Sequence, residues 1–351
     1  MINREESKEE FHEKMAADHT KSKTKKKKPN RVIDYLVYLL VRLVSMAIQL
    51  QEVNRSLSLA RWLGRGFYRW YGRGRRRALE HLRLSFPEKS AAWIEKVAQR
   101  SFEHIVMLVF DVFWTARLVR PTTWRHFFEI NPREVQPVYD LADAKKGLIM
   151  VTGHYGSFEA LGCAMGASGL TNYSIGRPID NRFIDQYLRR TRQNQGQIII
   201  NKKGASDQMA DILSSGKFLA FVADQNGSRK DVFVDFFGRK AATYKSIGLL
   251  AMRYHVPIVA GCCRRIDDRF QFQINVTRLI QPQHWQDKPD PLHWITQQYT
   301  SAIETFVRQD PGQYWWLHRR WKTRPPHERR ANAPSTPRKT EVAGHTHSAG
   351  G

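Results

Sequence analysis

The stretch that decides the fold reads GLIMVTGHYGSFEALG and covers residues 147–162. An apolar run with the length of a buried β-strand ends at Thr152-Gly153, and a helical pattern follows at once. Residues five positions apart on one helix lie roughly 140° apart around its axis, so His154 and Glu159 can meet only if His154 precedes the helix. We therefore expect His154 in a strand-to-helix turn and the Glu159 carboxylate folded back onto its imidazole, as a base with its orienting group.

Both residues also have a structural interpretation. A histidine near the end of a strand can simply be part of the packing, and a glutamate in the first turn of a helix interacts favourably with the helix dipole. Ser157, between them, is interpreted as the N-cap of the helix and not as a nucleophile.

The pattern outward from this stretch predicts an α/β fold. Strand-like runs are followed by helical patterns, which is typical of a mixed, mostly parallel sheet flanked by helices with right-handed crossovers. The expected strands cover 147–152, 172–175, 197–200, 217–223, 256–263 and 270–277, and the expected helices cover 91–113, 157–167, 181–195, 205–214, 244–254 and about 291–309.

Composition indicates an anionic partner. The chain has 351 residues, a formal net charge of +24 and ten Trp. Such an excess of positive charge favours nucleic acid, an anionic membrane surface or an acidic protein, and the tryptophans favour a membrane interface. Cys163, Cys262 and Cys263 form no CxxC pair and are predicted to be buried, reduced thiols of a cytosolic compartment.

The sequence divides into four segments. Residues 1–30 form a Lys-rich tail and 326–351 a second polar tail, both predicted to be disordered. Residues 31–78 are predicted to be membrane-associated helices, and 79–325 the catalytic domain. The apolar stretch 32–50 has the length of a membrane span but contains Asp34 and Arg42, so a helix embedded in one membrane face is favoured over a full span.

The segment 59–77 carries two rows of residues. Arginines recur at every fourth position from Arg61 to Arg77, and apolar residues recur from Leu59 to Tyr71, displaced by two. On one helix the rows would be opposed, as in an amphipathic helix at a membrane interface; an ordinary surface helix packed on the core remains the alternative.

Five ordered motifs carry a family resemblance. They are His154 with Glu159, Gly176-Arg177-Pro178 with Asn181, the strand end VADQN at 222–226, the loop VDFFGRKAAT at 234–243 and the segment WWLHRRWK at 315–322. Together they resemble the His-x4-Glu late acyltransferases of lipid A biosynthesis, the lauroyl/myristoyl transferase family, over about residues 32–325. The Lys-rich tail, and Lys240 where the family often has Pro, depart from its pattern.

The resemblance implies a glycerolipid acyltransferase-like fold and transfer of a fatty acyl chain from a thioester to a hydroxyl of a glycolipid. His154 is then the general base and Glu159 its partner in a catalytic dyad, without an acyl-enzyme. Substrate-binding roles are expected for Arg177, Asp224, Gln225, Arg239 and Thr243. Asp224 is expected to order the site, and an ion pair of Arg177 with Asp224 is the alternative for that pair. No metal and no cofactor are expected beyond the thioester co-substrate.

The expected partners are acyl carrier protein or acyl-CoA, a glycolipid acceptor such as a lipid A precursor, and an anionic membrane surface, at the cytoplasmic face of the inner membrane. An acceptor that is another glycolipid or polar lipid remains open. A basic nucleic-acid-binding protein is the alternative from another class, but it leaves the tryptophans, the 32–50 stretch and the His154 turn unexplained, so no nucleic acid is expected. A non-catalytic scaffold would not need His154 with Glu159.

Overall fold

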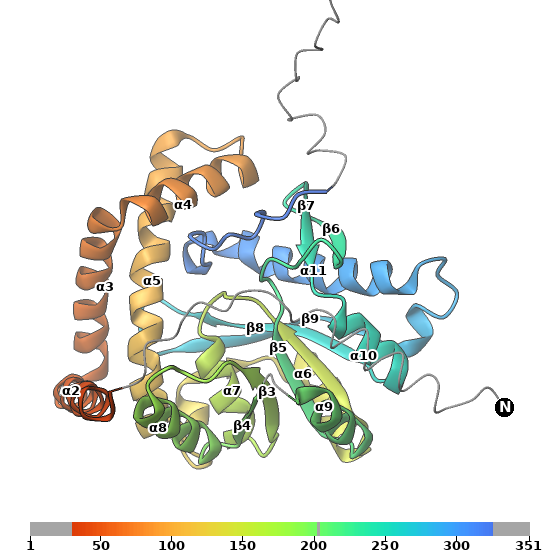
Figure 1. Ribbon diagram of the computed structural model, residues 1–351, viewed down its shortest axis with the longest axis horizontal. Coiled ribbons are helices and arrows are strands. Elements are labelled where there is room, and N and C mark those ends of the chain that lie inside the picture. The colour runs from red at the N-terminus through yellow and green to blue at the C-terminus, as the bar shows by residue number, and fades with distance from the viewer. Residues whose placement is uncertain (1–29, 202–203, 326–351) are drawn as a thin grey trace, which may run out of the picture.

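The computed structural model describes residues 30–201 and 204–325 (Figure 1). Both tails predicted from the sequence lie outside the described residues, apart from Asn30. The helices are α2 (Arg31–Gln49), α3 (Val53–Trp70), α4 (Gly72–Ser85), α5 (Ala91–Leu118), α6 (Pro132–Asp143), α7 (Phe158–Ala167), α8 (Arg182–Gln193), α9 (Ala205–Ser214), α10 (Ser246–Tyr254) and α11 (Pro291–Gln309), with short 3-10 turns η2 (Trp124–His126), η3 (Pro282–His284) and η4 (Pro311–Gln313).

Among the described residues, a seven-stranded sheet has the order β1-β9-β8-β2-β5-β3-β4. Its strands are β1 (Phe128–Ile130), β2 (Leu148–Thr152), β3 (Asn172–Gly176), β4 (Gln197–Asn201), β5 (Phe218–Val222), β8 (Ile258–Arg265) and β9 (Phe272–Ile280). All neighbouring pairs are parallel except β8 with β9, which are antiparallel. The predicted mixed, mostly parallel sheet is therefore confirmed.

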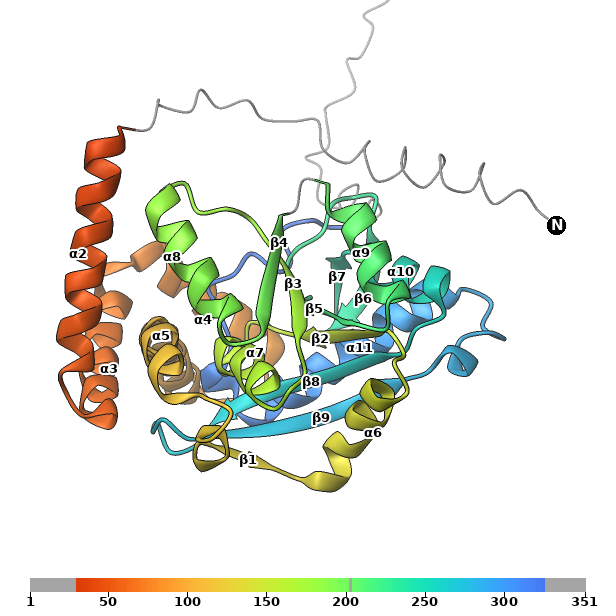
Figure 2. The same cartoon turned by 90° about the horizontal axis from the view of Figure 1, so that it is seen from below.

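Helices cover both faces of this sheet. In Figures 1 and 2, α10 and α11 lie on one face and α6 and α7 on the other. The inward side chains alternate along each strand: Ile149, Val151 and Leu219 belong to one buried cluster, whereas Leu148 and Phe218 belong to the other. This period-two alternation is the pattern of a sheet buried on both sides, so the core consists of two layers separated by the strands.

The hairpin of β6 (Val232–Phe236) and β7 (Arg239–Thr243) was not predicted, because 234–243 was interpreted as a loop. The strands are joined by Phe237 and Gly238, whose φ angles are 53° and 67°. Two-residue hairpin turns with positive φ at both positions usually carry Asn-Gly or Asp-Gly. A phenylalanine in the first of these positions gives no such signal. The rings of Phe236 and Phe237 are both buried in the core.

The N-terminal helices α2 and α3 lie together on one side of the molecule, where α2 is seen end-on in Figure 1 and along its length in Figure 2. By length and composition α2 is apolar enough to cross a membrane. The helix predicted across 59–77 is interrupted, because α3 ends at Trp70 and α4 begins at Gly72. The two rows of residues therefore do not run along one continuous helix.

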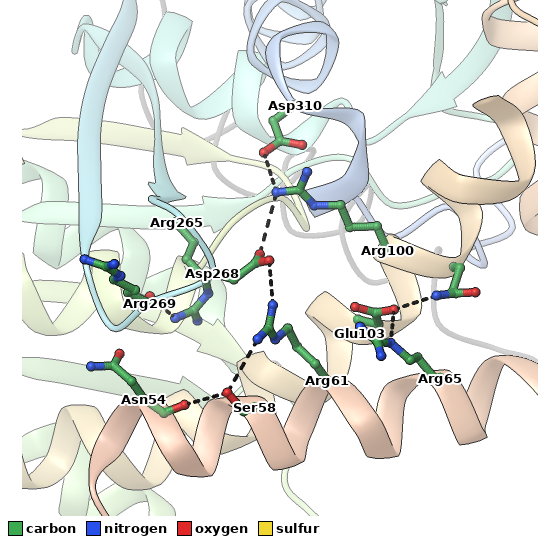
Figure 3. A network of polar contacts seen from close by, with 11 residues as sticks. Asn54, Ser58, Arg61, Arg65, Arg100, Glu103, Arg265, Asp268, Arg269 and Asp310 are labelled. Atoms are coloured by element: carbon green, nitrogen blue, oxygen red, sulfur yellow. Dashed lines mark hydrogen bonds and ion pairs between the residues drawn. The ribbon is translucent and has the colours of Figure 1, made fainter.

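Polar contacts join α3 to the rest of the domain (Figure 3). The Arg61 guanidinium lies 3.1 Å from Asp268 in the β8–β9 turn, and Arg65 lies 3.0 Å from Glu103 of α5. Between them α3 packs closely on α5, since a Cβ added to Gly64 would lie 2.4 Å from the Glu103 Cα atom. The first arginines of the predicted row thus hold α3 against the domain.

Candidate active site

The site begins at the ends of two adjacent parallel strands. Thr152 of β2 and Val222 of β5 are register partners, and His154 and Asp224 each follow two residues later. Both side chains are consequently delivered to the carboxyl edge of the sheet, where ligands bind in open α/β folds. His154 is 7% exposed and Asp224 is 2% exposed, so the pair is shielded from bulk water.

Asp224 holds His154 by both its ring and its backbone. The imidazole Nδ1 lies 2.6 Å from Asp224 Oδ1, and the His154 backbone N–H donates to Asp224 Oδ2 at 2.9 Å. Burial alone would raise the pKa of Asp224, but the charge and hydrogen bonds of His154 outweigh it and hold that pKa well below its usual range. The ionised carboxylate fixes the tautomer with the proton on Nδ1 and leaves the Nε2 lone pair to act as a base.

The turn that carries His154 is clamped from several elements. The Gly156 N–H donates to the Gln313 carbonyl oxygen and the Ser157 N–H to that of Cys263. Gly156 has a φ of +56°, and a Cβ there would lie 2.0 Å from the Cys263 oxygen, so glycine is required. Ser157 caps α7, as predicted, and its hydroxyl donates to the buried Asp111.

Glu159 does not contact the His154 imidazole, which corrects the predicted pairing. Its carboxylate accepts two hydrogen bonds from Arg192 of α8, from Nε at 3.0 Å and from Nη2 at 2.6 Å. A bidentate pair with arginine is a strong alternative to an imidazole contact, and it occupies both carboxylate oxygens. The residue that orients His154 in the structure is therefore Asp224, which the sequence interpretation had assigned to ordering the site.

A cavity of 630 Å³ opens beside His154, between the sheet and the helices α7 and α8. Residues of β2, β3, β4 and β5 line it on the side of the sheet, and Glu159 of α7 and Arg192 of α8 line it on the side of the helices. Apolar lining residues on several elements include Met150, Leu161, Met165, Ile199, Ala220 and Val222. The cavity is within the size range of ligand sites and is suited to an extended apolar group.

Arg177 and Gln225, two of the residues predicted to bind substrate, line this cavity. The Arg177 side chain is 77% exposed and lies 3.8 Å from Asp180, so the alternative pairing with Asp224 is not formed. The Gln225 amide nitrogen lies 3.5 Å from His154 Nε2. Gln225 is thus the predicted binding residue nearest to the basic nitrogen.

Arg239 and Thr243 are not among the residues that line the cavity, which differs from their predicted role. The Arg239 guanidinium lies over the Trp321 ring at 4.6 Å, and the fully buried Thr243 hydroxyl accepts from Arg320 at 2.6 Å. Both residues belong to the β7 strand and bind it to the C-terminal segment. Their neighbours Tyr244, Lys245 and Ser246 line the cavity instead.

Much of the C-terminal segment 315–322 packs inside the domain. Trp316, Arg320 and Trp321 are buried, at 0%, 2% and 5% exposed. The Arg320 guanidinium donates to the backbone oxygens of Gln225 and Ala242, and these bonds compensate its burial. The segment therefore fixes the Asp224-Gln225 strand end from behind.

Two aromatic side chains of this segment pack on the base. The Trp315 and His318 rings lie 4.9 Å and 4.7 Å from that of His154. Burial, followed by the charge of His154, lowers the pKa of His318, so this second imidazole is uncharged at neutral pH. Burial likewise raises the pKa of Cys163 and of Cys262 to about 12, which keeps these thiols protonated and unsuited to nucleophilic catalysis.

Sequence reasoning missed Arg192, Asp111 and Arg265. Asp111 and Arg265 form a buried ion pair behind Ser157, at 0% and 2% exposed. Each of the three lies more than 30 positions from its partner along the chain, so local spacing gave no signal. For Asp111 and Arg265, the sequence signal was a charged residue in or beside an apolar run, in 105–114 and 256–265.

A family model described as bacterial lipid A biosynthesis acyltransferase matches residues 20–323. The chain is 26% identical over 251 residues to the lipid A biosynthesis lauroyltransferase of Escherichia coli K12, covering 70% of this chain and 78% of that protein. It is 25% identical over 256 residues to the palmitoleoyltransferase of the same strain, covering 71% and 78% of the two chains. It is also 25% identical over 291 residues to the myristoyltransferase, covering 78% and 83%.

Proposed function

We propose, since the chain belongs to the bacterial lipid A biosynthesis acyltransferase family and is an acyltransferase, that it transfers a fatty acyl chain from a thioester to a hydroxyl of a lipid A precursor. The observation that carries this proposal is the His154–Asp224 pair at the edge of a largely apolar cavity. The relatives are named as acyltransferases of lipid A biosynthesis, and the matches to them cover 70–78% of this chain.

In the proposed mechanism His154 Nε2 takes the proton from the acceptor hydroxyl as the oxygen attacks the thioester carbonyl. The Asp224 carboxylate holds the imidazole by Nδ1 and stabilises the imidazolium that forms. The tetrahedral intermediate then collapses to the ester, and the thiolate leaves and takes up the proton held by His154. A positioned general base contributes about 10²–10⁴ in rate.

Glu159 acts in this proposal through Arg192 and not through the imidazole. The pair forms part of the cavity wall, with Glu159 on α7 and Arg192 on α8. By fixing α8 against the first turn of α7, it keeps the wall closed beside the acyl chain. Glu159 therefore remains a residue of the active site, as a positioning residue.

Arg177, Gln225 and Lys245 are proposed to bind the polar parts of the substrates, because they line the cavity near His154. Arginine and lysine suit the phosphates of a lipid A precursor or of the phosphopantetheine arm that carries the thioester. We propose acyl carrier protein as the donor, with acyl-CoA as the alternative, and the cytoplasmic face of the inner membrane as the place of reaction.

Mass spectrometry of lipid A and of total glycolipid, from cells with and without this gene, tests the proposal. Loss of one ester-linked acyl chain from lipid A in the deleted strain is the expected result, restored by the wild-type gene and not by a His154→Gln variant. Unchanged lipid A with loss of an acyl chain from another glycolipid would keep the acyltransferase chemistry and replace the proposed acceptor.

A further inference from the structure

We propose that α2 and α3 together form a platform that lies in the plane of an anionic lipid bilayer, and that α2 does not cross it. The platform is defined by the outward residues of α2 and α3. Its apolar part on α2 includes Val32, Ile33, Leu36, Leu40, Leu43 and Met46, with Leu50 directly after the helix. Its part on α3 consists of Leu59, Trp62, Leu63 and Trp70, and all of these residues are exposed.

Both ends of α2 are attached to the same domain. Near its first turn, the Asn181 amide donates to the Asp34 carbonyl oxygen at 2.7 Å. At its last residue, the Gln49 amide donates to the Phe113 carbonyl oxygen at 2.8 Å, and Arg117 donates to the Gln49 carbonyl oxygen. Fifteen residues of helix separate Asp34 from Gln49, or about 22 Å.

This double attachment excludes a span in the observed conformation. If α2 crossed the bilayer, the surfaces of α5 and α8 that touch it would be drawn into the hydrocarbon over about the same 22 Å. These surfaces carry the exposed charged residues Arg117, Arg182 and Arg190. Charged side chains facing lipid are strongly unfavourable, so the domain and both ends of α2 belong on one side.

Arg42 of α2 faces the domain and not the lipid, and Asp34, on the same side of the helix, is half-buried. The Arg42 guanidinium lies 4.7 Å from the Tyr187 ring centre on α8 and donates to the Tyr38 hydroxyl at 3.1 Å. Ser45 and Ile48, on the same stripe, are buried. Apart from Arg31 at its start, the outward side of α2 is therefore uncharged and can be immersed along its length.

The outward side of α3 has the composition of a membrane-interface helix. Trp62 and Trp70 are 66% and 85% exposed, and the exposed Arg55 and Arg69 lie on the same side. Ser56, Ala60 and Gly64 occupy the inner side, where α3 packs against α5, and Arg61 and Arg65 are held by the ion pairs of Figure 3. Tryptophan beside arginine suits the boundary between acyl chains and anionic headgroups.

The platform also lies beside the proposed active site. Phe183 and Tyr187 on one side of α8 touch the Tyr35 and Tyr38 rings of α2. Asp185, Arg189 and Arg192 on the other side of α8 line the cavity. One helix therefore separates the lipid surface from the cavity, which gives a membrane-bound acceptor a short route to His154.

The first experiment labels single cysteines with a membrane-impermeant maleimide in inner-membrane vesicles of known orientation. Arg31→Cys and Gln51→Cys flank α2, and Arg229→Cys, in an exposed loop, marks the domain side; the three native cysteines are buried. We expect all three cysteines to react with the maleimide from the same side of the membrane. Any other pattern, above all Arg31→Cys reacting only from the side opposite Arg229→Cys, overturns it.

The second experiment measures binding to phosphatidylethanolamine vesicles with and without phosphatidylglycerol. Trp62→Ser/Trp70→Ser should weaken binding to the anionic vesicles by about tenfold or more and leave acyl transfer in detergent unchanged. Leu84→Ser, at an exposed apolar residue at the end of α4 away from α3, is the control and should bind normally. Unchanged vesicle binding of the double variant, or a change in its oligomeric state instead, contradicts a lipid-facing platform.

Discussion

The carboxylate of Asp224 holds His154 at two points, at the ring Nδ1 and at the backbone N–H, with distances of 2.6 Å and 2.9 Å. The two contacts use the two oxygens separately, so the carboxylate sets the orientation of the imidazole and the position of the turn together. A neutral amide cannot replace it, because one end of an amide is a donor.

Asp224→Asn is therefore expected to lower kcat by about 10²–10⁴. If the NH2 group of the introduced asparagine faces the ring, it donates to Nδ1 and enforces the tautomer with the proton on Nε2. If the NH2 group faces the backbone, it meets the His154 N–H, which is also a donor. Steady-state kinetics with saturating thioester and acceptor measure the effect, with the melting temperature recorded to separate misfolding. A folded Asp224→Asn protein with wild-type kcat would show that Asp224 does not orient the base.

Glu159→Gln and Arg192→Gln are expected to have similar effects, each lowering transfer by about 10- to 100-fold, because each breaks the same charged hydrogen bonds. The double variant should be little worse than either single one, since the two groups act as a unit. Arg308→Gln, which breaks an exposed pair with Glu304 on α11, is the control and should leave transfer unchanged. Loss of all transfer in Glu159→Gln with full transfer in Arg192→Gln would restore a direct role of Glu159 at the imidazole.

The size of the cavity is expected to set which acyl chain lengths the protein accepts. Ala220 lies on β5 in the cavity wall, in register with Met150 and Ser174 on the neighbouring strands. Ala220→Leu places a larger side chain in the cavity and should shift the preference toward shorter acyl chains. Competition between thioesters of different lengths, read by mass spectrometry of the product, checks this shift. The same chain-length profile in a folded Ala220→Leu protein would place the acyl chain elsewhere.

Acid should destabilise the domain through its buried histidines. Burial lowers the pKa of His81 to about 4 and that of His104 to about 3, below the value of about 6.5 expected when unfolded. The unfolded chain then binds more protons between these values, so stability is complete above about pH 6.5 and falls by roughly 1.4 kcal/mol per pH unit for each histidine toward pH 4. The free energy of unfolding, measured from pH 7 to pH 4.5, tests this slope.

His81→Gln should reduce the slope of unfolding free energy against pH by the contribution of one histidine. This holds even if the substitution lowers the stability at pH 7. His126→Gln, at an exposed histidine, should leave the slope unchanged. An equal slope in the His81→Gln and wild-type proteins would mean that His81 is not held neutral by burial.

The sheet could be predicted because its signal is local. The runs around β2, β5 and β8 are short, apolar and bounded by turn residues, and the structure confirms these strands within two residues of the expected bounds. The β6–β7 hairpin could not be predicted in the same way, since its turn uses Phe237 where Asn or Asp is usual.

The site was predicted in part, because the residues that meet there lie far apart along the chain. His154 and Asp224 are 70 positions apart, and they meet because β2 and β5 are neighbours with Thr152 opposite Val222. Strand order is not encoded locally, so the sequence favoured Glu159, which is near His154 along the chain. Arg192, which pairs with Glu159, lies 33 positions away on α8 and could not be found from the spacing of residues in the sequence.

Transfer by the purified His154→Gln protein tests directly whether His154 is the general base. Glutamine at this position keeps a polar side chain beside Asp224 but has no basic nitrogen to take the hydroxyl proton. We expect a folded protein that still binds acyl thioester and whose kcat for transfer to a lipid A precursor falls by about 10²–10⁴. Near-wild-type transfer by a folded His154→Gln protein would contradict this role of His154.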